Sequence, residues 1–219
     1  MTDRALERGW LVPKLLLGAV VLFVLLDQVV PVVPLVFLSH DSVPRPDPTG
    51  EPIQEESGRA PFREWRRMKE FVLTPRASYD ISALVLSTER YRFGAAGAIL
   101  PWDFAVGWGE AVTQDVFGRI SVSQFSRFYS WSTRDPSLDV RAVTRSSANV
   151  HLIAASRRIE RGFARVRRGD VVRLEGDLVD IEGPDGFTWK TSLSRDDTGP
   201  GACETLYVRW LTVGSRRYR

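Results

Sequence analysis

The sequence has little sulfur and little histidine. Its 219 residues include one cysteine, Cys203, and two histidines, His40 and His151. A single cysteine excludes a disulfide within the chain, and these three side chains are too few for the usual zinc ligand sets. We therefore expect no structural metal and no cofactor, and we expect packing to stabilise the fold.

The chain also lacks a strong excess of charge of one sign. It has 30 Lys and Arg against 27 Asp and Glu, a formal net charge of +3 and a sequence pI near 9.3. This excess is too small to predict a nucleic-acid partner. The length allows one domain of about 150 residues with appendages.

A long apolar run lies near the N-terminus, in residues 10–38. Between Leu15 and Leu38 the only charged residue is Asp27. A helix that spans a bilayer needs about 20 mostly apolar residues, so this run is expected to be a transmembrane anchor, regular as far as Pro31. A cleaved signal peptide is the alternative, but the run is longer than the usual apolar region of about 7 to 15 residues and no small-x-small site follows it.

The charges that flank the run predict its orientation. Three cations precede the apolar residues, whereas Arg45 is the only cation in residues 39–58. Positive flanks stay inside, so residues 1–9 are expected to be cytoplasmic, and the rest of the chain periplasmic or extracellular at a bacterial inner membrane. Asp27 is then either a charge tolerated near the helix end or a contact with a partner helix in the bilayer.

The remainder divides by composition into a linker, a domain and a tail. Residues 39–61 are rich in proline, glycine, serine and acids, as flexible linkers are. Residues 62–213 are expected to form the folded domain, and residues 214–219 a basic tail. The sequence therefore predicts a single-pass membrane protein with a compact domain outside the membrane.

Local patterns in the domain favour a mainly β (α+β) fold. Aromatics at helical spacing predict a short amphipathic helix over residues 62–73. Residues 79–131 are rich in β-branched and aromatic residues and predict several strands, with a bend at "GAAGAILPW". We expect a small β-barrel or a curved sheet, accompanied by one or two helices.

The C-terminal half continues this pattern. Ser156 is a plausible N-cap for a helix that ends before Gly169. Two strands follow, joined by a Gly-Pro-Asp-Gly turn, and Gly176 in the first of them suggests a bulge or a barrel bend. The segment "ETLYVRWLTV" predicts a last strand.

Two resemblances rest on motifs in this half. The segment "VRRGDVVRLEGDLV" resembles the first half of a small closed barrel of the OB type. The motifs "SANVHLIAAS", "GDVVRLEGDLV" and "SLSRDDTGPGACE", in this order after an apolar span, resemble a family of uncharacterised bacterial proteins with one membrane anchor. This second resemblance covers residues 102–210, and it implies a location and a domain boundary but no activity.

The candidate site lies in the first and last of these motifs, where polar side chains are expected to form a binding rim. The stretch Ser192–Glu204 is either a turn whose Asp side chains bond backbone N–H groups or a carboxylate set for a hard cation. Cys203 with His151 is a less favoured thiol and base. The rim candidates are Asn149, His151, Ser194, Arg195, Asp196, Asp197 and Glu204.

Two classes of function remain open. An anchored extracytoplasmic binding or assembly module of an envelope complex is favoured, because an anchor, a spacer and a domain are expected without a recognisable catalytic set. The alternative is a membrane-tethered hydrolase, a metal-dependent phosphoesterase or nuclease-like enzyme, that uses the "SRDDTGPGACE" region.

Overall fold

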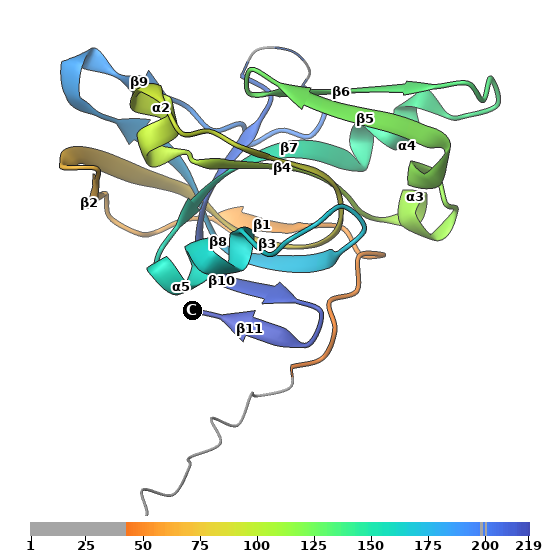
Figure 1. The fold of residues 1–219 in the computed structure, drawn as a ribbon, viewed down its shortest axis with the longest axis horizontal. Helices are drawn as coiled ribbons and strands as arrows, with labels where there is room; N and C mark the ends of the chain where they lie inside the picture. The colour runs from red at the N-terminus through yellow and green to blue at the C-terminus, as the bar shows by residue number, and fades with distance from the viewer. Residues whose placement is uncertain (1–42, 198, 200) are drawn as a thin grey trace, which may run out of the picture. The chain divides into compact units, whose positions relative to one another are not determined.

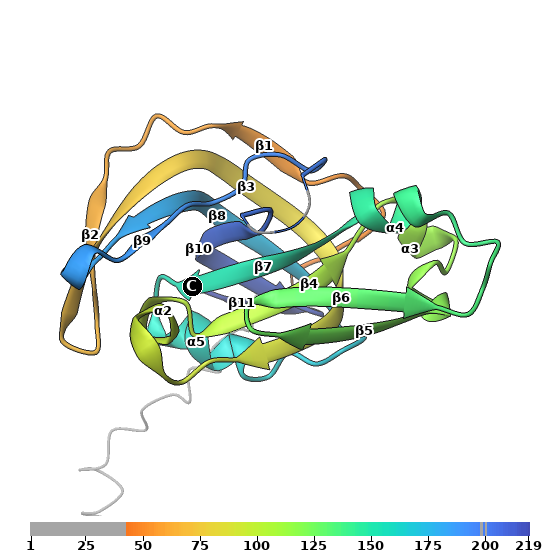
Figure 2. The same ribbon diagram turned by 90° about the horizontal axis from the view of Figure 1, so that it is seen from above.

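The computed structural model describes residues 43–197, 199 and 201–219, and these form a mainly β fold with short helices (Figures 1 and 2). The strands are β1 (Ile53–Glu56), β2 (Phe62–Arg66), β3 (Lys69–Arg90), β4 (Trp102–Gly107), β5 (Ile120–Phe125), β6 (Phe128–Thr133), β7 (Ser147–Ala154), β8 (Val171–Glu182), β9 (Thr188–Trp189), β10 (Glu204–Val213) and β11 (Arg216–Tyr218). The helices are α2 (Gly94–Ile99), α3 (Glu110–Thr113), α4 (Val140–Arg145) and α5 (Arg157–Phe163), with 3₁₀ turns η1 (Phe117–Arg119) and η2 (Pro184–Gly186).

The expected anchor, residues 10–38 with Asp27, lies outside the described residues. Among the residues that are described, none of the helices has the length and apolar character needed to cross a bilayer. Residues 41–219 make up one compact unit. This unit contains its own apolar core, which is the property of a domain that folds by itself.

Five strands close into a ring. The order around it is β3, β4, β7, β10 and β8, and β8 pairs back with β3. The neighbours are antiparallel except β7 and β10, which run parallel. Closure is made by β3, whose 22 residues curve enough to pair with β8 along one part and with β4 along another (Figure 2). A barrel and a curved sheet were the two expected architectures. The strand pairings form a closed ring, which is the arrangement of a barrel.

The core lies inside the ring because every second side chain of each strand points inward. Phe104, Val150 and Leu206 are fully buried there, on three neighbouring strands. Helix α5 adds Ile159 and Phe163 to the same cluster. The predicted cap of this helix is confirmed, since the Ser156 hydroxyl accepts a hydrogen bond from the Ile159 N–H.

The paired strands β8 and β10 approach each other closely at Gly176. A Cβ atom at this position would lie 2.0 Å from the Tyr207 carbonyl oxygen. The register of β10 shifts opposite it, between Val208 and Trp210. The irregularity that the glycine suggested is therefore present, and it falls on the partner strand.

The helix expected over residues 62–73 is wrong, because β2 and the start of β3 form a hairpin there. Arg66 pairs with Lys69, and the two residues between them, Arg67 and Met68, have φ angles of 49° and 60°. Two positive φ values are the geometry of a two-residue turn that matches strand twist. Aromatics that fit helical spacing also fit the two arms of this hairpin, so spacing alone did not separate the alternatives.

Three smaller boundaries also differ from expectation. Strand β1 lies inside residues 39–61, and β11 inside residues 214–219, which corrects both the linker and the tail. Each pairs with a ring strand through main-chain hydrogen bonds, which need no apolar composition. The "GAAGAILPW" bend contains helix α2, and the part of the chain that the structure describes has four α-helices where one or two were expected.

A separate hairpin, β5 and β6, covers part of the outside of the ring (Figure 1). Tyr129 and Trp131 project from one side of β6 and pack against an apolar cluster that includes Phe117 and Val143. The Tyr129 hydroxyl lies 2.8 Å from the Ser147 hydroxyl at the start of β7. This hairpin forms one wall of the site described next.

Candidate functional site

A pocket of about 300 Å³ opens where β7 and β10 begin side by side. We call it the β7–β10 pocket. Its walls come from the β5–β6 hairpin, from the segment that follows β4, and from the loop that leads into β10. Aromatic and polar side chains line it together: Trp108, Tyr129, Trp131, Asn149, Arg195 and Glu204.

Glu204 is the most unusual group in the pocket. It is the first residue of β10 and has the same inward phase as Leu206 and Val208, so only 4% of its surface is exposed. Burial, with a smaller contribution from nearby Asp197, raises the pKa of its carboxyl to about 8, although a backbone hydrogen bond and Arg195 act in the opposite direction. Its Oε2 atom has no hydrogen-bond partner among the described residues. At neutral pH the pocket therefore contains a carboxylic acid, which can donate a hydrogen bond.

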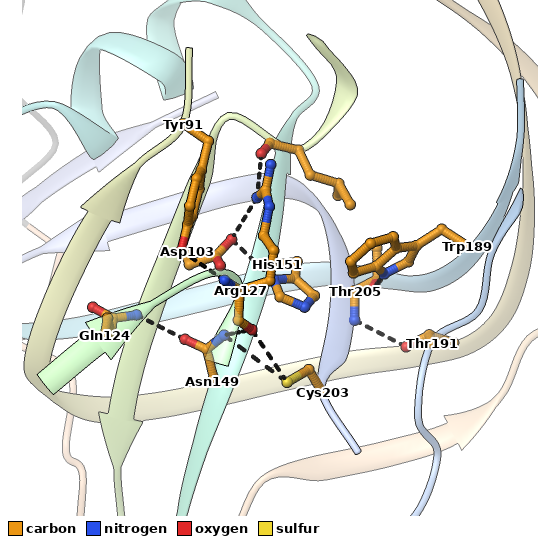
Figure 3. Close-up of polar contacts among 11 residues, drawn as sticks. Tyr91, Asp103, Gln124, Arg127, Asn149, His151, Trp189, Thr191, Cys203 and Thr205 are labelled. Carbon is orange, nitrogen blue, oxygen red and sulfur yellow. Dashed lines mark hydrogen bonds and ion pairs between the residues drawn. The ribbon is translucent and has the colours of Figure 1, made fainter. Parts of the chain in front are cut away.

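Asn149 is fixed from two sides. Its Oδ1 accepts a hydrogen bond of 2.7 Å from Gln124 on β5, and its Nδ2 donates one of 3.0 Å to the Arg127 carbonyl (Figure 3). The same Nδ2 lies 3.9 Å from the Cys203 sulfur. Because these partners set the orientation of the amide, Asn149 presents a fixed polar edge beside the pocket.

The loop before β10 is a turn built by its own side chains. The Ser192 hydroxyl donates to Asp197 at 2.6 Å and accepts the Ser194 N–H at 3.0 Å, and the Ser194 hydroxyl accepts the Asp196 N–H at 3.2 Å. Serine and aspartate side chains commonly bond backbone groups in this way. The described part of this loop is therefore held by turn-type hydrogen bonds, but serine hydroxyls accept the backbone N–H groups where Asp side chains were expected to do so.

Arg195 links the loop to the segment before β1. Its Nη1 lies 3.3 Å from Glu51 Oε2, and its Nη2 donates to the Pro52 carbonyl at 2.8 Å. Glu51 also accepts a hydrogen bond of 3.0 Å from the Trp108 indole. The carboxylate of Glu51 thus holds two lining side chains of the pocket in place.

The structure brings five of the predicted rim residues to the β7–β10 pocket and leaves two outside it. Asp196 is exposed, and its carboxylate lies 3.4 Å from Arg145 Nε. His151 is buried at 1% exposure on β7 in a different cluster. The five that line the pocket are Asn149, Ser194, Arg195, Asp197 and Glu204.

His151 belongs to a buried cluster of polar groups centred on Asp103 (Figure 3). Its Nδ1 lies 2.9 Å from Asp103 Oδ1, but the angle is not that of a hydrogen bond, whereas Arg127 Nη1 donates to this oxygen at 3.0 Å. Arg127 also donates to the Leu100 carbonyl at 2.6 Å, and its guanidinium stacks 3.7 Å above the Tyr91 ring. These contacts give Arg127 and His151 a structural role that joins the hairpin to the ring.

Cys203 lies between the two regions. With His151 and Trp189 it lines a second hollow of about 240 Å³. Burial raises the pKa of its thiol to about 11. The thiolate is the reactive form of cysteine, so the structure gives no support to the Cys203 and His151 pair as nucleophile and base. Within residues 43–197, 199 and 201–219 no three His, Cys, Asp or Glu side chains come together as metal ligands.

Sequence reasoning missed the aromatic half of the pocket. Tyr129 and Trp131 alternate with Ser130 and Ser132 on β6. This alternation indicates a strand with aromatic side chains on one side, and it could have been used. Trp108 carried no comparable signal, because it follows β4 and is placed by its bond to Glu51, far away in the chain.

Comparison with known proteins adds no relative to this description. No family model, no curated protein and no solved structure matches the chain. The function proposed below therefore rests on the geometry of the site.

Proposed function

We propose that residues 43–219 form a binding module built on a barrel of the OB type. The support is the order of the ring: three consecutive antiparallel strands (β3, β4, β7), then helix α5, then two strands (β8, β10) of which the last runs parallel to the third. The OB fold is a five-stranded Greek-key barrel, and it binds ligands on the face of its second and third strands and in adjoining loops. The β7–β10 pocket adjoins the third strand of this ring.

The ligand that suits the pocket is a neutral, hydroxyl-bearing ring such as a sugar unit of a glycan. The observation that carries this proposal is the buried Glu204, whose Oε2 has no hydrogen-bond partner among the described residues and which lines the pocket together with Tyr129 and Trp131. Burial raises the pKa of this carboxyl to about 8. A carboxylic acid and a fixed amide donate and accept hydrogen bonds with hydroxyl groups. Aromatic faces cover the apolar side of a ring, and a few convergent polar groups in a pocket of this size fix its orientation.

The location of the module remains the one proposed from sequence. The apolar run 10–38 and its flanking charges support an anchored domain outside a bacterial inner membrane. In that place a glycan of the cell envelope is the accessible form of the ligand. An assembly role through Asp27 in the membrane stays a separate proposal, for which the sequence alone provides support.

Titration of the fragment 41–219 with a panel of neutral and acidic oligosaccharides tests the binding proposal. Tryptophan fluorescence should change on binding of a neutral sugar, because Trp108 and Trp131 line the pocket. Trp131→Ala should weaken binding at least tenfold. Trp210→Ala is the matched control, since Trp210 stacks on Arg217 away from the pocket, and it should bind as the parent does. Equal loss in both variants would contradict the proposal.

A hydrolase that uses the same residues is the second candidate. One feature favours it: burial raises the pKa of the Glu204 carboxyl to about 8, with a smaller contribution from the charge of nearby Asp197, and a carboxyl group with a raised pKa is typical of a general acid. Incubation of the fragment with aryl glycosides separates the two functions. A pure binding module should release no aryl alcohol, whereas release that Glu204→Gln abolishes would establish the hydrolase.

A further inference from the structure

Three turns of the domain expose large apolar side chains in one region of its surface. They are the β2–β3 turn (residues 65–69), the segment after β3 (residues 90–93) and the β5–β6 turn (residues 125–128). We call this region the loop-tip surface. Of the eight large apolar side chains that are exposed among the described residues, five belong to it, so their clustering is not an even scatter: Trp65 at 60%, Met68 at 95%, Phe93 at 88%, Phe125 at 60% and Phe128 at 41%.

Contacts between the turns hold them together. Arg67 in the first turn donates a hydrogen bond to the Arg92 carbonyl in the second. The Tyr91 hydroxyl accepts the Arg127 N–H of the third turn at 3.0 Å, and the Arg127 guanidinium covers the Tyr91 ring. In Figures 1 and 2 the β2–β3 turn lies at one end of the molecule with α2 next to it, and the turn of the β5–β6 hairpin faces that end from nearer the middle. The apolar tips are therefore parts of one surface.

This surface is cationic and carries no carboxylate of its own. The three segments contain six Lys and Arg and no Asp or Glu. Arg66 pairs with Glu64 and Arg127 with Asp103. The other four cations are exposed at the tips and complement an anionic partner: Arg67, Lys69, Arg90 and Arg92.

We propose that the loop-tip surface docks onto an anionic phospholipid membrane. Apolar side chains that project beyond the backbone enter the region between headgroups and acyl chains, while cations beside them attract the anionic headgroups. Met68 and Phe93, the two most exposed, stand at turns and project singly, which suits insertion. A single-stranded nucleic acid would instead be bound by a row of aromatic faces along a groove. This proposal is independent of the ligand of the β7–β10 pocket.

Co-sedimentation of the fragment 41–219 with vesicles tests the proposal. The fragment is suitable because it holds the whole compact unit. It should bind vesicles of phosphatidylcholine and phosphatidylglycerol in equimolar mixture at least tenfold more tightly than vesicles of phosphatidylcholine alone. Binding should weaken as the salt concentration rises, because part of the attraction is between exposed charges.

Two double variants separate the apolar and the charged contributions. Met68→Ser with Phe93→Ser removes the two most exposed tips, and Lys69→Glu with Arg92→Glu reverses two charges. Each should weaken binding to the anionic vesicles at least tenfold and leave the melting temperature unchanged, since all four side chains are exposed.

Matched variants outside the surface serve as controls. Ile53→Ser with Val140→Ser, and Arg134→Glu with Arg141→Glu, change exposed residues of the same kinds and should bind as the parent does. Equal binding to both vesicle types, or equal loss in test and control variants, would overturn the proposal. So would binding of a single-stranded oligonucleotide in preference to vesicles, lost in the same two test variants.

Discussion

A buried carboxyl oxygen without a hydrogen-bond partner lowers the stability of a folded chain, and Oε2 of Glu204 is such an atom among the described residues. Its position on β10 directs it inward, where Asp197 adds a second negative charge nearby. Sites for ligands are often places where a structure tolerates a group of this kind. Glu204, whose buried carboxyl lowers the stability of the fold, is thus also the residue that the proposed ligand contacts.

Stability should depend on pH through Glu204. Between about pH 4.5 and pH 8 the folded state holds a proton that the unfolded chain has lost, because burial raises the pKa of this carboxyl from 4.5 to about 8. The contribution of Glu204 therefore lowers stability as pH rises, with a limiting slope of about 1.4 kcal/mol per pH unit. Urea unfolding at several pH values measures it. Glu204→Gln should remove this slope and be more stable than the parent above pH 8; an unchanged slope would refute the assignment.

Asp103 is expected to be a strong contributor to stability. It is fully buried and is the partner of Arg127, whose side chain is only 13% exposed. Asp103→Ala should lower the free energy of unfolding by about 3–5 kcal/mol, because it leaves a buried cation unpaired. Asp135→Ala breaks the more exposed pair with Arg119 and should cost less than about 1 kcal/mol. Similar losses in the two variants, measured by urea unfolding, would contradict a structural role for the Asp103 cluster.

Among the strands and turns, the features predicted correctly from the sequence are those that depend on residues close together in the chain. The N-cap at Ser156 and the turn before β9 depend on residues near in sequence, and both are confirmed. The β2–β3 hairpin was mistaken for a helix because its strands are fixed by pairing with each other and by the pairing of β3 with β8, which the spacing of aromatics does not record. Strand β1 was missed for the same reason.

The close approach of the paired strands β8 and β10 makes Gly176 sensitive to substitution. The nearest atom to an added Cβ is a backbone carbonyl oxygen, which cannot rotate away. Gly176→Ala should therefore lower the free energy of unfolding by about 1–3 kcal/mol. Gly58→Ala, where nothing lies within 4 Å of an added Cβ, should change it by less than about 0.5 kcal/mol. Thermal or urea unfolding of the two variants measures the difference. Equal stabilities would contradict this prediction, because they would show that β8 and β10 can move apart at no cost.

For the molecule as a whole, local residue patterns were enough to predict a mainly β domain but not how the domain closes. Closure depends on β3, one strand that pairs with both β4 and β8, and a sequence gives no measure of such curvature. The pocket depends on closure in turn, because the parallel starts of β7 and β10 bring Asn149 and Glu204 together from segments 55 residues apart. Five of the rim residues could be selected from their motifs, whereas the aromatic wall required the folded chain.

The central claim is that the β7–β10 pocket binds a neutral, hydroxyl-bearing ring beside Glu204. Chemical-shift mapping by NMR of the fragment 41–219, titrated with neutral oligosaccharides at pH 6, tests it most directly. The account predicts shifts of the Trp108 and Trp131 indole N–H signals and of the Asn149 amide, with the Trp65 indole unmoved. Shifts confined to residues outside the pocket, or none with any neutral sugar while an acidic one binds at Arg195, would contradict it.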